Sequence, residues 1–191
     1  MGPRVRGDDS VVCGGLRGNG GSGRAMISRL RPGLIAAIAV LALDQASKLW
    51  LLFVFDIVHR GGKVEVTPFF DLVLGWNVGI SFGWFQNDGA AAQIILTLIK
   101  AVAVIVLAIW MARSRSLLAT IALGMIIGGA IGNAIDRFAY GAVVDFALFH
   151  VALAGHDYAW YVFNLADTAI VAGVAALLYD SFLGVPAAKA P

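Results

Sequence analysis

The chain has 191 residues, of which 60% are hydrophobic and 14% are charged, and its formal net charge is +2. Soluble domains are about 45–50% apolar and about 25% charged, so this composition, with a mean hydropathy of +0.84, indicates a protein solvated by lipid. The small net charge argues against a nucleic-acid partner. A single cysteine, Cys13, excludes an intramolecular disulfide.

The N-terminal residues 1–32 are rich in glycine and arginine and show almost no apolar periodicity, so we expect a disordered cytoplasmic tail. No apolar stretch precedes Cys13, which therefore does not fit a lipid-attachment site or the end of a signal peptide. Met26 lies inside this tail. Residues 1–25 fit equally well an extension upstream of a second usable translation start at Met26.

Four apolar stretches follow, each close to the roughly 20 residues that a helix needs to cross a bilayer. Backbone groups in lipid must hydrogen-bond within their own segment, so each stretch is expected to be helical. We expect membrane-spanning helices at residues 34–55, 90–112, 117–138 and 161–183. They define a membrane domain over residues 33–184, followed by a short cytoplasmic tail at 185–191. The predicted fold class is an all-α polytopic membrane protein.

The lysine and arginine residues predict the orientation of these spans. With the N-terminus inside, nine of them lie on the inner side and three on the outer side, and the excess persists without residues 1–25. Both termini are therefore expected in the cytoplasm, with outer segments at 56–89 and 139–160. Segment 56–89 contains β-branched and aromatic residues between turn formers such as Pro68 and Gly75, which predicts a small β-rich element outside the membrane.

Polar residues inside the expected spans are informative, because each is costly in lipid. Asp44 and Lys48 are four residues apart on one helix face, where they can form a packed ion pair or where Asp44 can orient a site. Asn133, Asp136 and Arg137 lie near the outer end of the third span. Because Arg137 directly follows Asp136, we expect a structural ion pair between these two residues.

Two further carboxylates follow along the chain. Asp145 lies in the apolar run 142–149, which favours its protonated form, although a turn or helix-capping role also fits. Asn164 and Asp167 open the fourth span, where Asn164 can cap the helix and Asp167 can occupy its first turn.

Spans three and four run in opposite directions and are joined by a short segment, so these polar residues should meet near one outer level of the membrane. Two carboxylates in a poorly solvated place tend to share a proton, which supplies one base and one acid for peptide hydrolysis. No Ser–His or Cys–His pair is apparent. His59, His150 and His156 fall in the outer segments, where solvated interface residues are expected rather than a metal site.

At these motifs the chain resembles the bacterial lipoprotein signal peptidases, or signal peptidase II. The matching pieces appear in the family's order: DQASK at 44–48, NVGISF at 77–82, GGAIGNAIDR at 128–137, GAVVDF at 141–146 and FNLAD at 163–167. The resemblance implies a four-helix membrane fold with a small outer β-structure. It also implies an inner-membrane aspartic endopeptidase that removes the signal peptide of prolipoproteins just before a diacylglyceryl-modified cysteine, without a metal or organic cofactor.

The family's catalytic aspartates fall on Asp145 and Asp167, with the active site at the outer face. Its supporting positions fall on eight residues: Asp44, Lys48, Asn77, Gly79, Asn133, Asp136, Arg137 and Asn164. Ser81 stands where the family most often has alanine, and Lys100, deep in the second span, matches no motif of the family.

Two other classes compete with the peptidase. Intramembrane Asp and Lys residues also mark proton paths, so a proton-coupled transporter or channel subunit is the main alternative. A structural scaffold is the third class, but clustered Asn and Asp residues would be needlessly costly in it. Acids gathered at one membrane face, without an internal repeat, favour the peptidase.

Overall fold

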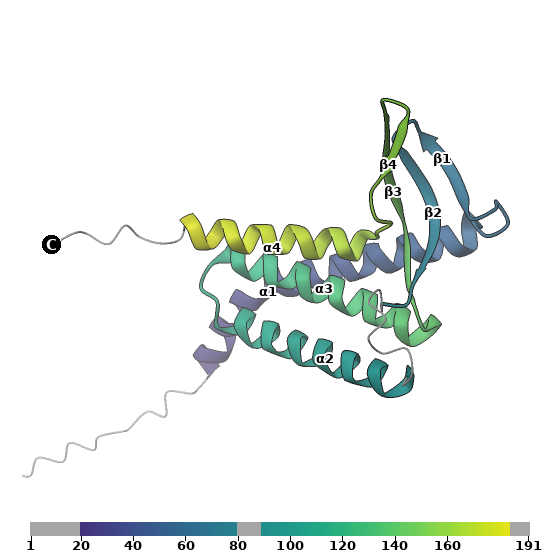
Figure 1. The fold of residues 1–191 in the computed structure, drawn as a ribbon. Helices are drawn as coiled ribbons and strands as arrows, with labels where there is room; N and C mark the ends of the chain where they lie inside the picture. The colour runs from purple at the N-terminus through teal and green to yellow at the C-terminus, as the bar shows by residue number, and fades with distance from the viewer. Residues whose placement is uncertain (1–19, 80–88, 184–191) are drawn as a thin grey trace, which may run out of the picture.

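A computed structural model describes the backbone of residues 20–79 and 89–183. Helix α1 (Gly20–Leu49) continues into a short π-helix, η1 (Trp50–Val54), and is followed by α2 (Gly89–Arg113), α3 (Leu117–Tyr140) and α4 (Leu165–Leu183). The strands are β1 (Lys63–Thr67), β2 (Phe70–Asn77), β3 (Val143–Leu153) and β4 (His156–Ala159). Figure 1 shows the helices as a bundle with the strands at one end.

Three stretches of described helix are long and apolar enough to cross a bilayer, namely Leu30–Val54, Leu117–Tyr140 and Leu165–Phe182. They correspond to the first, third and fourth expected spans, so a mostly helical membrane protein is confirmed. The second expected span, 90–112, coincides with α2, a helix of 25 residues. Its crossing of the membrane stays a prediction, as does the division into tails and a membrane domain.

Two helix boundaries differ from the sequence-based ones. Helix α1 begins at Gly20, well before residue 33, so the last part of the expected disordered tail is helical. Leu30 explains part of this extension, because it packs against the core residues Met111 and Leu123. Helix α4 begins at Leu165 rather than near 161, because the preceding residues join β3 through the bridge between Ala147 and Phe163.

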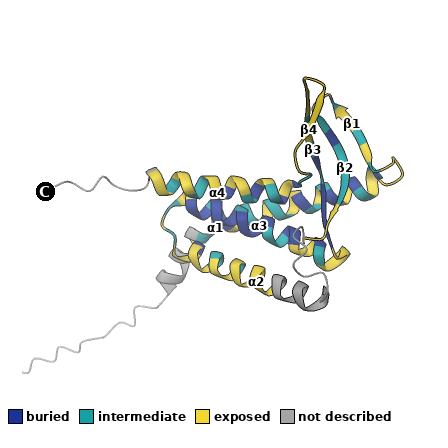
Figure 2. Cartoon of the chain, in the orientation of Figure 1, coloured by how far each residue is buried: buried dark blue, intermediate teal, exposed yellow. Residues whose placement is uncertain are grey.

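Helix α3 lies at the centre of the bundle, and Figure 2 shows it as the most deeply buried helix. Glycine makes this position possible. A Cβ atom on Gly129 would lie only 2.6 Å from the backbone oxygen of Ala166 in α4, and one on Gly132 would lie 2.6 Å from Asp44 Oδ2 in α1. Close approach of three helices therefore brings the polar residues of α1, α3 and α4 within hydrogen-bonding distance.

The four strands form one antiparallel sheet in the order β1-β2-β3-β4. The expected β-rich element in 56–89 thus supplies β1 and β2, and the outer segment 139–160, for which no strand was expected, supplies β3 and β4. Strand β3 escaped prediction because its sequence, VVDFALFHVAL, is almost continuously apolar rather than alternating. Pairing of β2 with β3 sets Gly75 opposite Asp145 and Asn77 opposite Val143, which fixes Asp145 beside the end of β2.

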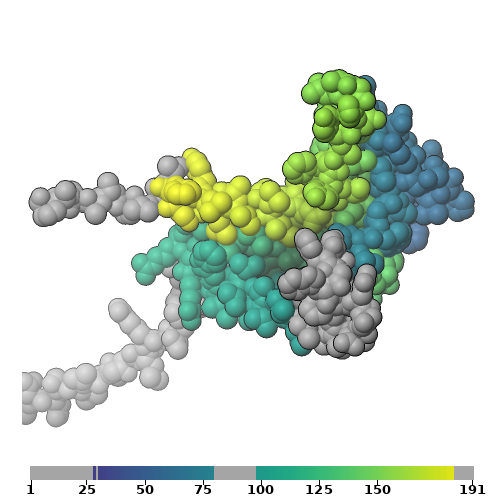
Figure 3. All heavy atoms as spheres, in the orientation of Figure 1, coloured from purple at the N-terminus to yellow at the C-terminus, as the bar shows by residue number. Residues whose placement is uncertain are grey.

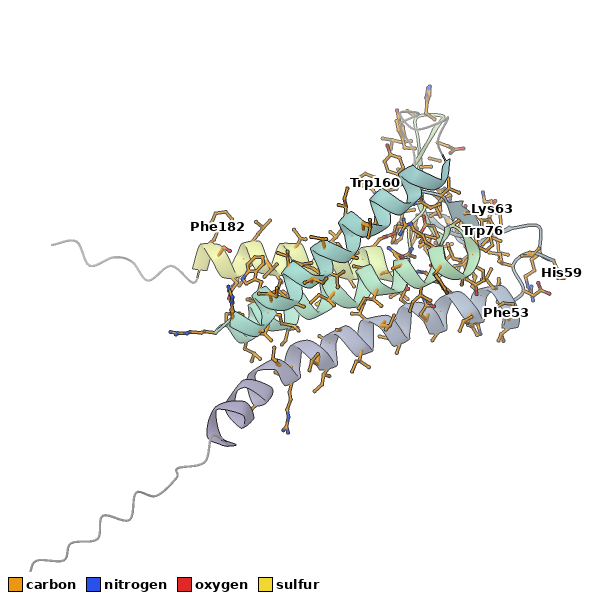
Figure 4. All side chains as sticks on the ribbon, turned by 90° about the horizontal axis from the view of Figure 1, so that it is seen from below. Phe53, His59, Lys63, Trp76, Trp160 and Phe182 are labelled. Carbon is orange, nitrogen blue, oxygen red and sulfur yellow. The ribbon has the colours of Figure 1, made fainter. Side chains whose placement is uncertain are left out.

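The sheet projects past one end of the bundle, as the space-filling view shows (Figure 3). Helix α1 begins and α4 ends at the opposite end, near the turn between α2 and α3 (Figure 1). Figure 4 places Phe182 at that end and Lys63, Trp76 and Trp160 at the sheet end. Large apolar side chains are exposed along the helices, including Phe53 at 70% and Phe182 at 80%, as a lipid-facing surface requires.

Candidate active site

Asp145 lies on β3 and is 3% exposed. Both of its carboxylate oxygens accept hydrogen bonds from side-chain amides. Asn164 Nδ2 donates to Oδ1 at 2.6 Å, and Asn77 Nδ2 donates to Oδ2 at 3.1 Å. Burial raises the pKa of Asp145, and the nearby charge of Asp167 acts in the same direction, while the bonds from Asn77 and Asn164 only partly oppose it.

Asp167 lies in the first turn of α4 and is partly exposed. Its backbone N–H donates to Asn164 Oδ1 at 2.9 Å, and its Oδ2 accepts from the backbone N–H of Asn164 at 3.3 Å. This reciprocal pattern is a capping box built from Asn and Asp. Asn133 Nδ2 donates to the other oxygen, Oδ1, at 2.9 Å. The capping role weighed for Asn164 and Asp167 is therefore real, and it holds Asp167 toward α3.

Asn164 connects the two aspartates. Its side chain is 1% exposed, and its amide group donates to Asp145 while its oxygen accepts from the N–H of Asp167. The same Nδ2 also lies 3.1 Å from Asn133 Oδ1 and 3.3 Å from the backbone oxygen of Val144. Asn164 thereby fixes β3, which carries Asp145, relative to the start of α4, which carries Asp167.

A buried lysine, Lys48, contacts the polar residues next to the two aspartates. Lys48 Nζ lies 2.7 Å from Asp44 Oδ2, 2.7 Å from Asp136 Oδ2 and 3.2 Å from Asn133 Oδ1. Each of the three charged residues is at most 2% exposed. Asp44 Oδ1 also accepts from the backbone N–H of Ala166, one residue before Asp167. The expected ion pair of Asp44 and Lys48 is present, and Asp44 also holds the start of α4.

Asp136 does not form the ion pair with Arg137 that their adjacency in the sequence predicted. Its ionic partner is Lys48, and Oδ2 also accepts from the backbone N–H of Val144 at 3.2 Å. Successive residues of a helix point in different directions, so Asp136 faces α1 while Arg137 donates to the backbone oxygen of Asn133 at 3.1 Å. The correction places Asp136 between the lysine and the first residues of β3.

Gln45 is a residue of the site that sequence reasoning missed. Its Nε2 lies 2.9 Å from Asp136 Oδ1 and 3.2 Å from both Asp44 Oδ2 and the backbone oxygen of Gly132. The signal was its position next to Asp44 in an apolar span, since a buried amide needs partners. Gln45 closes the network between α1 and α3.

Asn77 and Gly79 lie at the edge of the site, where the described chain after β2 approaches α3. The backbone N–H of Gly79 donates to Asn77 Oδ1 at 2.9 Å, and its φ of 78° is in the left-handed region that favours glycine. A Cβ atom on Gly79 would lie 3.4 Å from Arg137 Nη2. This turn therefore orients Asn77 toward Asp145. Ser81 lies outside the described residues.

The three histidines lie apart from the two aspartates. His59 pairs with Asp56 at 2.7 Å and is exposed, and the ring of exposed His156 contacts the backbone oxygen of Ala154. His150 is 24% exposed and lies 3.2 Å from Asp71, so it is a paired residue of the sheet rather than a freely solvated one. Within the described parts of the chain, His, Cys, Asp and Glu side chains form no group of three suited to a metal ion.

Comparison with known proteins identifies the family. The family model described as signal peptidase (SPase) II matches residues 36–183. A lipoprotein signal peptidase of Nitrobacter hamburgensis is 75% identical over 162 residues, 85% of this chain and 98% of that protein. One from Rhodopseudomonas palustris is 66% identical with the same coverage.

The chain belongs to the signal peptidase II family.

The structural comparison finds the same fold in bacterial membrane enzymes. A bacterial membrane enzyme solved by the in meso method at 1.9 Å superimposes with a TM-score of 0.63 and 25% identity, over 78% of this chain and 91% of that one. A second such enzyme, solved at 2.3 Å, has a TM-score of 0.61 and 23% identity, over 83% and 94% of the two chains, and supports the fold alone. The family resemblance and the enzyme class, a membrane aspartic peptidase that processes prolipoproteins, are thereby confirmed.

Proposed function

We propose that Asp145 and Asp167 are the catalytic pair with which this signal peptidase II hydrolyses prolipoproteins, just before a diacylglyceryl-modified cysteine. The observation that supports this assignment is that one residue, Asn164, contacts both carboxylates: its side-chain amide donates to Asp145 and its backbone N–H donates to Asp167. The remaining polar side chains of the site hold these two in place and carry no bond-making role.

The proton shared by the pair belongs to Asp145 in the resting enzyme. Asp145 is almost fully buried in β3, which favours its neutral form. Asp167 is more exposed, and the first turn of α4 favours a negative charge there through the helix dipole. Asp145 is thus the general acid and Asp167 the general base.

The reaction then proceeds in two proton-coupled steps. Asp167 takes a proton from water as the water oxygen bonds to the scissile carbonyl carbon, and Asp145 gives its proton to the carbonyl oxygen. In the second step the C–N bond breaks, Asp167 passes its proton to the leaving nitrogen, and Asp145 recovers a proton from the collapsing diol. Both carboxyl groups return to their starting states, so one water is consumed and no other reactant is needed.

The finer topology is part of the same proposal. Helix α2 is the second of four spans, both termini lie in the cytoplasm of the bacterial inner membrane, and the sheet and the active site lie at its outer face. The opposite placement of the sheet and of the α2–α3 turn in the bundle supports this orientation (Figure 1). Arg113 ends α2 and Arg115 lies in that turn, as the positive-inside rule favours for a cytoplasmic loop.

The test is turnover of a diacylglyceryl prolipoprotein by purified Asp145→Asn, Asp167→Asn and the double variant, with binding measured separately. Asn keeps the size of the side chain but removes the ionisable group. Each single change should lower kcat by at least about 10²–10⁴-fold, and the double variant should be hardly worse, because the groups act as a unit. Asp157→Asn, at an exposed carboxylate of β4, is the matched control and should cleave normally.

Substantial turnover by one correctly folded single variant would remove that aspartate from the pair. Turnover by both would end the two-aspartate mechanism for this chain.

A further inference from the structure

Lys100 lies near the middle of α2, eleven residues after Gly89 and thirteen before Arg113. At about 1.5 Å per residue it is about 16 Å from one end of the helix and about 20 Å from the other. A lysine side chain close to a span's end can reach the membrane surface, but these distances exceed its reach. If α2 crosses the membrane as proposed, this cation stays within the hydrocarbon layer.

No carboxylate neutralises Lys100 within the described residues, where ion pairs involve other lysines or histidines. Its neighbour across the helices is another cation, since Lys100 lies close enough to Arg137 of α3 for the two charges to repel. A cation in lipid is costly unless acceptor groups surround it, and such residues usually serve a substrate or ion. The described residues supply no carboxylate for it.

The face of α2 that carries Lys100 turns toward α3. Val104 and Leu107 follow at helical spacings of four and seven, and both pack on the core formed by Met111 and Leu123. Lys100 is exposed although Val104 is half-buried. The packing of α2 on the core is therefore described as far as Val104, one turn C-terminal to Lys100, whose own side chain is exposed.

The depth of Lys100 matches a definite part of a bound signal peptide. From the α2–α3 turn, which the two helices share, Lys100 lies thirteen residues or about 20 Å along α2, and Asn133, which contacts Asp167, lies sixteen residues or about 24 Å along α3. Lys100 is thus about one helical turn deeper than the catalytic pair. A substrate helix ending at the scissile bond would have its last turn at this level.

That last turn offers the acceptors that Lys100 lacks. The last four carbonyl groups of a helix have no partner within the helix, and its C-terminal end carries the negative end of the helix dipole. A signal peptide keeps its basic N-terminal region in the cytoplasm, so its helix ends toward the outer face. We propose that the Lys100 ammonium group binds the carbonyl-rich last turn of the substrate's signal helix and positions the scissile bond at Asp145 and Asp167.

This inference rests on the proposed function and on α2 as a span, and it makes Lys100 a positioning residue. The test compares kcat and KM for a diacylglyceryl prolipoprotein. Lys100→Met should raise KM about 10- to 100-fold, as expected for a lost charged hydrogen bond, and leave kcat nearly unchanged. Lys100→Arg should stay close to the wild type. Ile99→Lys combined with Lys100→Met keeps a lysine at nearly the same depth on another face and should behave like Lys100→Met.

A second measurement identifies the group that contacts position 100. A photo-cross-linking residue replaces Lys100 or, as a control, Ile99, and substrate is added to a background carrying Asp167→Asn to prevent cleavage. We expect cross-links from position 100 to the last turn of the signal peptide, and fewer from position 99. Cross-links to phospholipid alone would overturn the proposal, and so would an unchanged KM or a loss confined to kcat in Lys100→Met.

These outcomes are separate from a failure of the catalytic assignment. If Asp145→Asn and Asp167→Asn are inactive while Lys100→Met has normal KM, only the role of Lys100 falls. If both aspartate variants cleave, the catalytic pair falls, and the KM values of the lysine variants still report whether position 100 binds the substrate.

Discussion

Asn164 Nδ2 donates a hydrogen bond of 2.6 Å to Asp145 Oδ1, and the same side chain accepts one of 2.9 Å from the backbone N–H of Asp167. One side-chain amide therefore links the carboxylate of a strand residue to the first turn of the helix that carries the second carboxylate. An aspartic peptidase needs its two acids in a fixed relation to one water and one carbonyl group, since small displacements cost large factors in rate. In this chain the cap of α4 provides that relation.

Asn164→Asp separates the capping role from the bridging role. Aspartate caps helices about as well as asparagine, so the fold should remain, but it cannot donate to Asp145 and it adds a negative charge. We expect kcat to fall about 10–100-fold, and the alkaline limb of the pH–rate profile to move to higher pH because a like charge raises the pKa of Asp145, the general acid. Circular dichroism checks the fold and a pH series of kcat checks the shift. A normal rate and profile would show that the bridge is dispensable.

Lys48→Met should mainly destabilise the protein. The change leaves Asp44 and Asp136 buried without their cation, and breaking a buried ion pair in this way costs about 3–5 kcal/mol. The midpoint of thermal unfolding in detergent measures the loss. Adding Asp136→Asn to Lys48→Met removes one uncompensated charge and should recover part of it. Equal midpoints for Lys48→Met and the wild type would mean that this cluster does not stabilise the bundle.

The sequence could predict most of the polar residues that the structure brings together, though not Gln45, and only part of their geometry. Helical spacing correctly placed Asp44 beside Lys48, and the capping pattern correctly related Asn164 to Asp167. The partner of Asp136 depended on how α1 packs against α3, which no local pattern contains, so its neighbour Arg137 was chosen wrongly.

Strand β3 was missed for a related reason. An apolar run between two spans gives no alternation to reveal a strand, and β3 is defined by its pairing with β2, a strand from the other outer segment. The same pairing positions Asp145, so the placement of one proposed catalytic residue followed from a long-range contact rather than from its own sequence.

The surroundings of Asp71 predict that the stability of the sheet depends on pH. It is buried on β2, 3.0 Å from Lys63 of β1 and 3.2 Å from His150 of β3. Burial alone would raise the pKa of Asp71, but Lys63 and His150 outweigh it and hold the pKa below its ordinary value of 3.8. The folded state therefore binds fewer protons than the unfolded chain in this range, so the stabilisation is present above pH 3.8 and is lost as the pH falls through the folded pKa.

The measurement for this cluster is the thermal unfolding midpoint of the wild type and Asp71→Asn from about pH 6 down to about pH 3. The wild type should lose more stability on acidification than the variant, so that the two curves approach each other toward the acid end. Asp157→Asn, in which an exposed carboxylate of β4 is removed, serves as the control and should follow the wild type. Parallel curves for the wild type and Asp71→Asn would contradict the role of this cluster.

The orientation in the membrane is the prediction on which the site of cleavage depends. The sheet and the α2–α3 turn lie at opposite ends of the bundle (Figure 1), so labels on them should report opposite sides. In a background carrying Cys13→Ser, we expect Ala154→Cys, in the turn between β3 and β4, to react with an impermeant maleimide in intact cells. Ser114→Cys, in the α2–α3 turn, should react only after the cells are opened. Asp145 and Asp167 lie at the sheet end, so the reverse labelling pattern would place the active site at the cytoplasmic face. The C-terminal end of a signal helix would not reach it there, and both the orientation and the role proposed for Lys100 would fail.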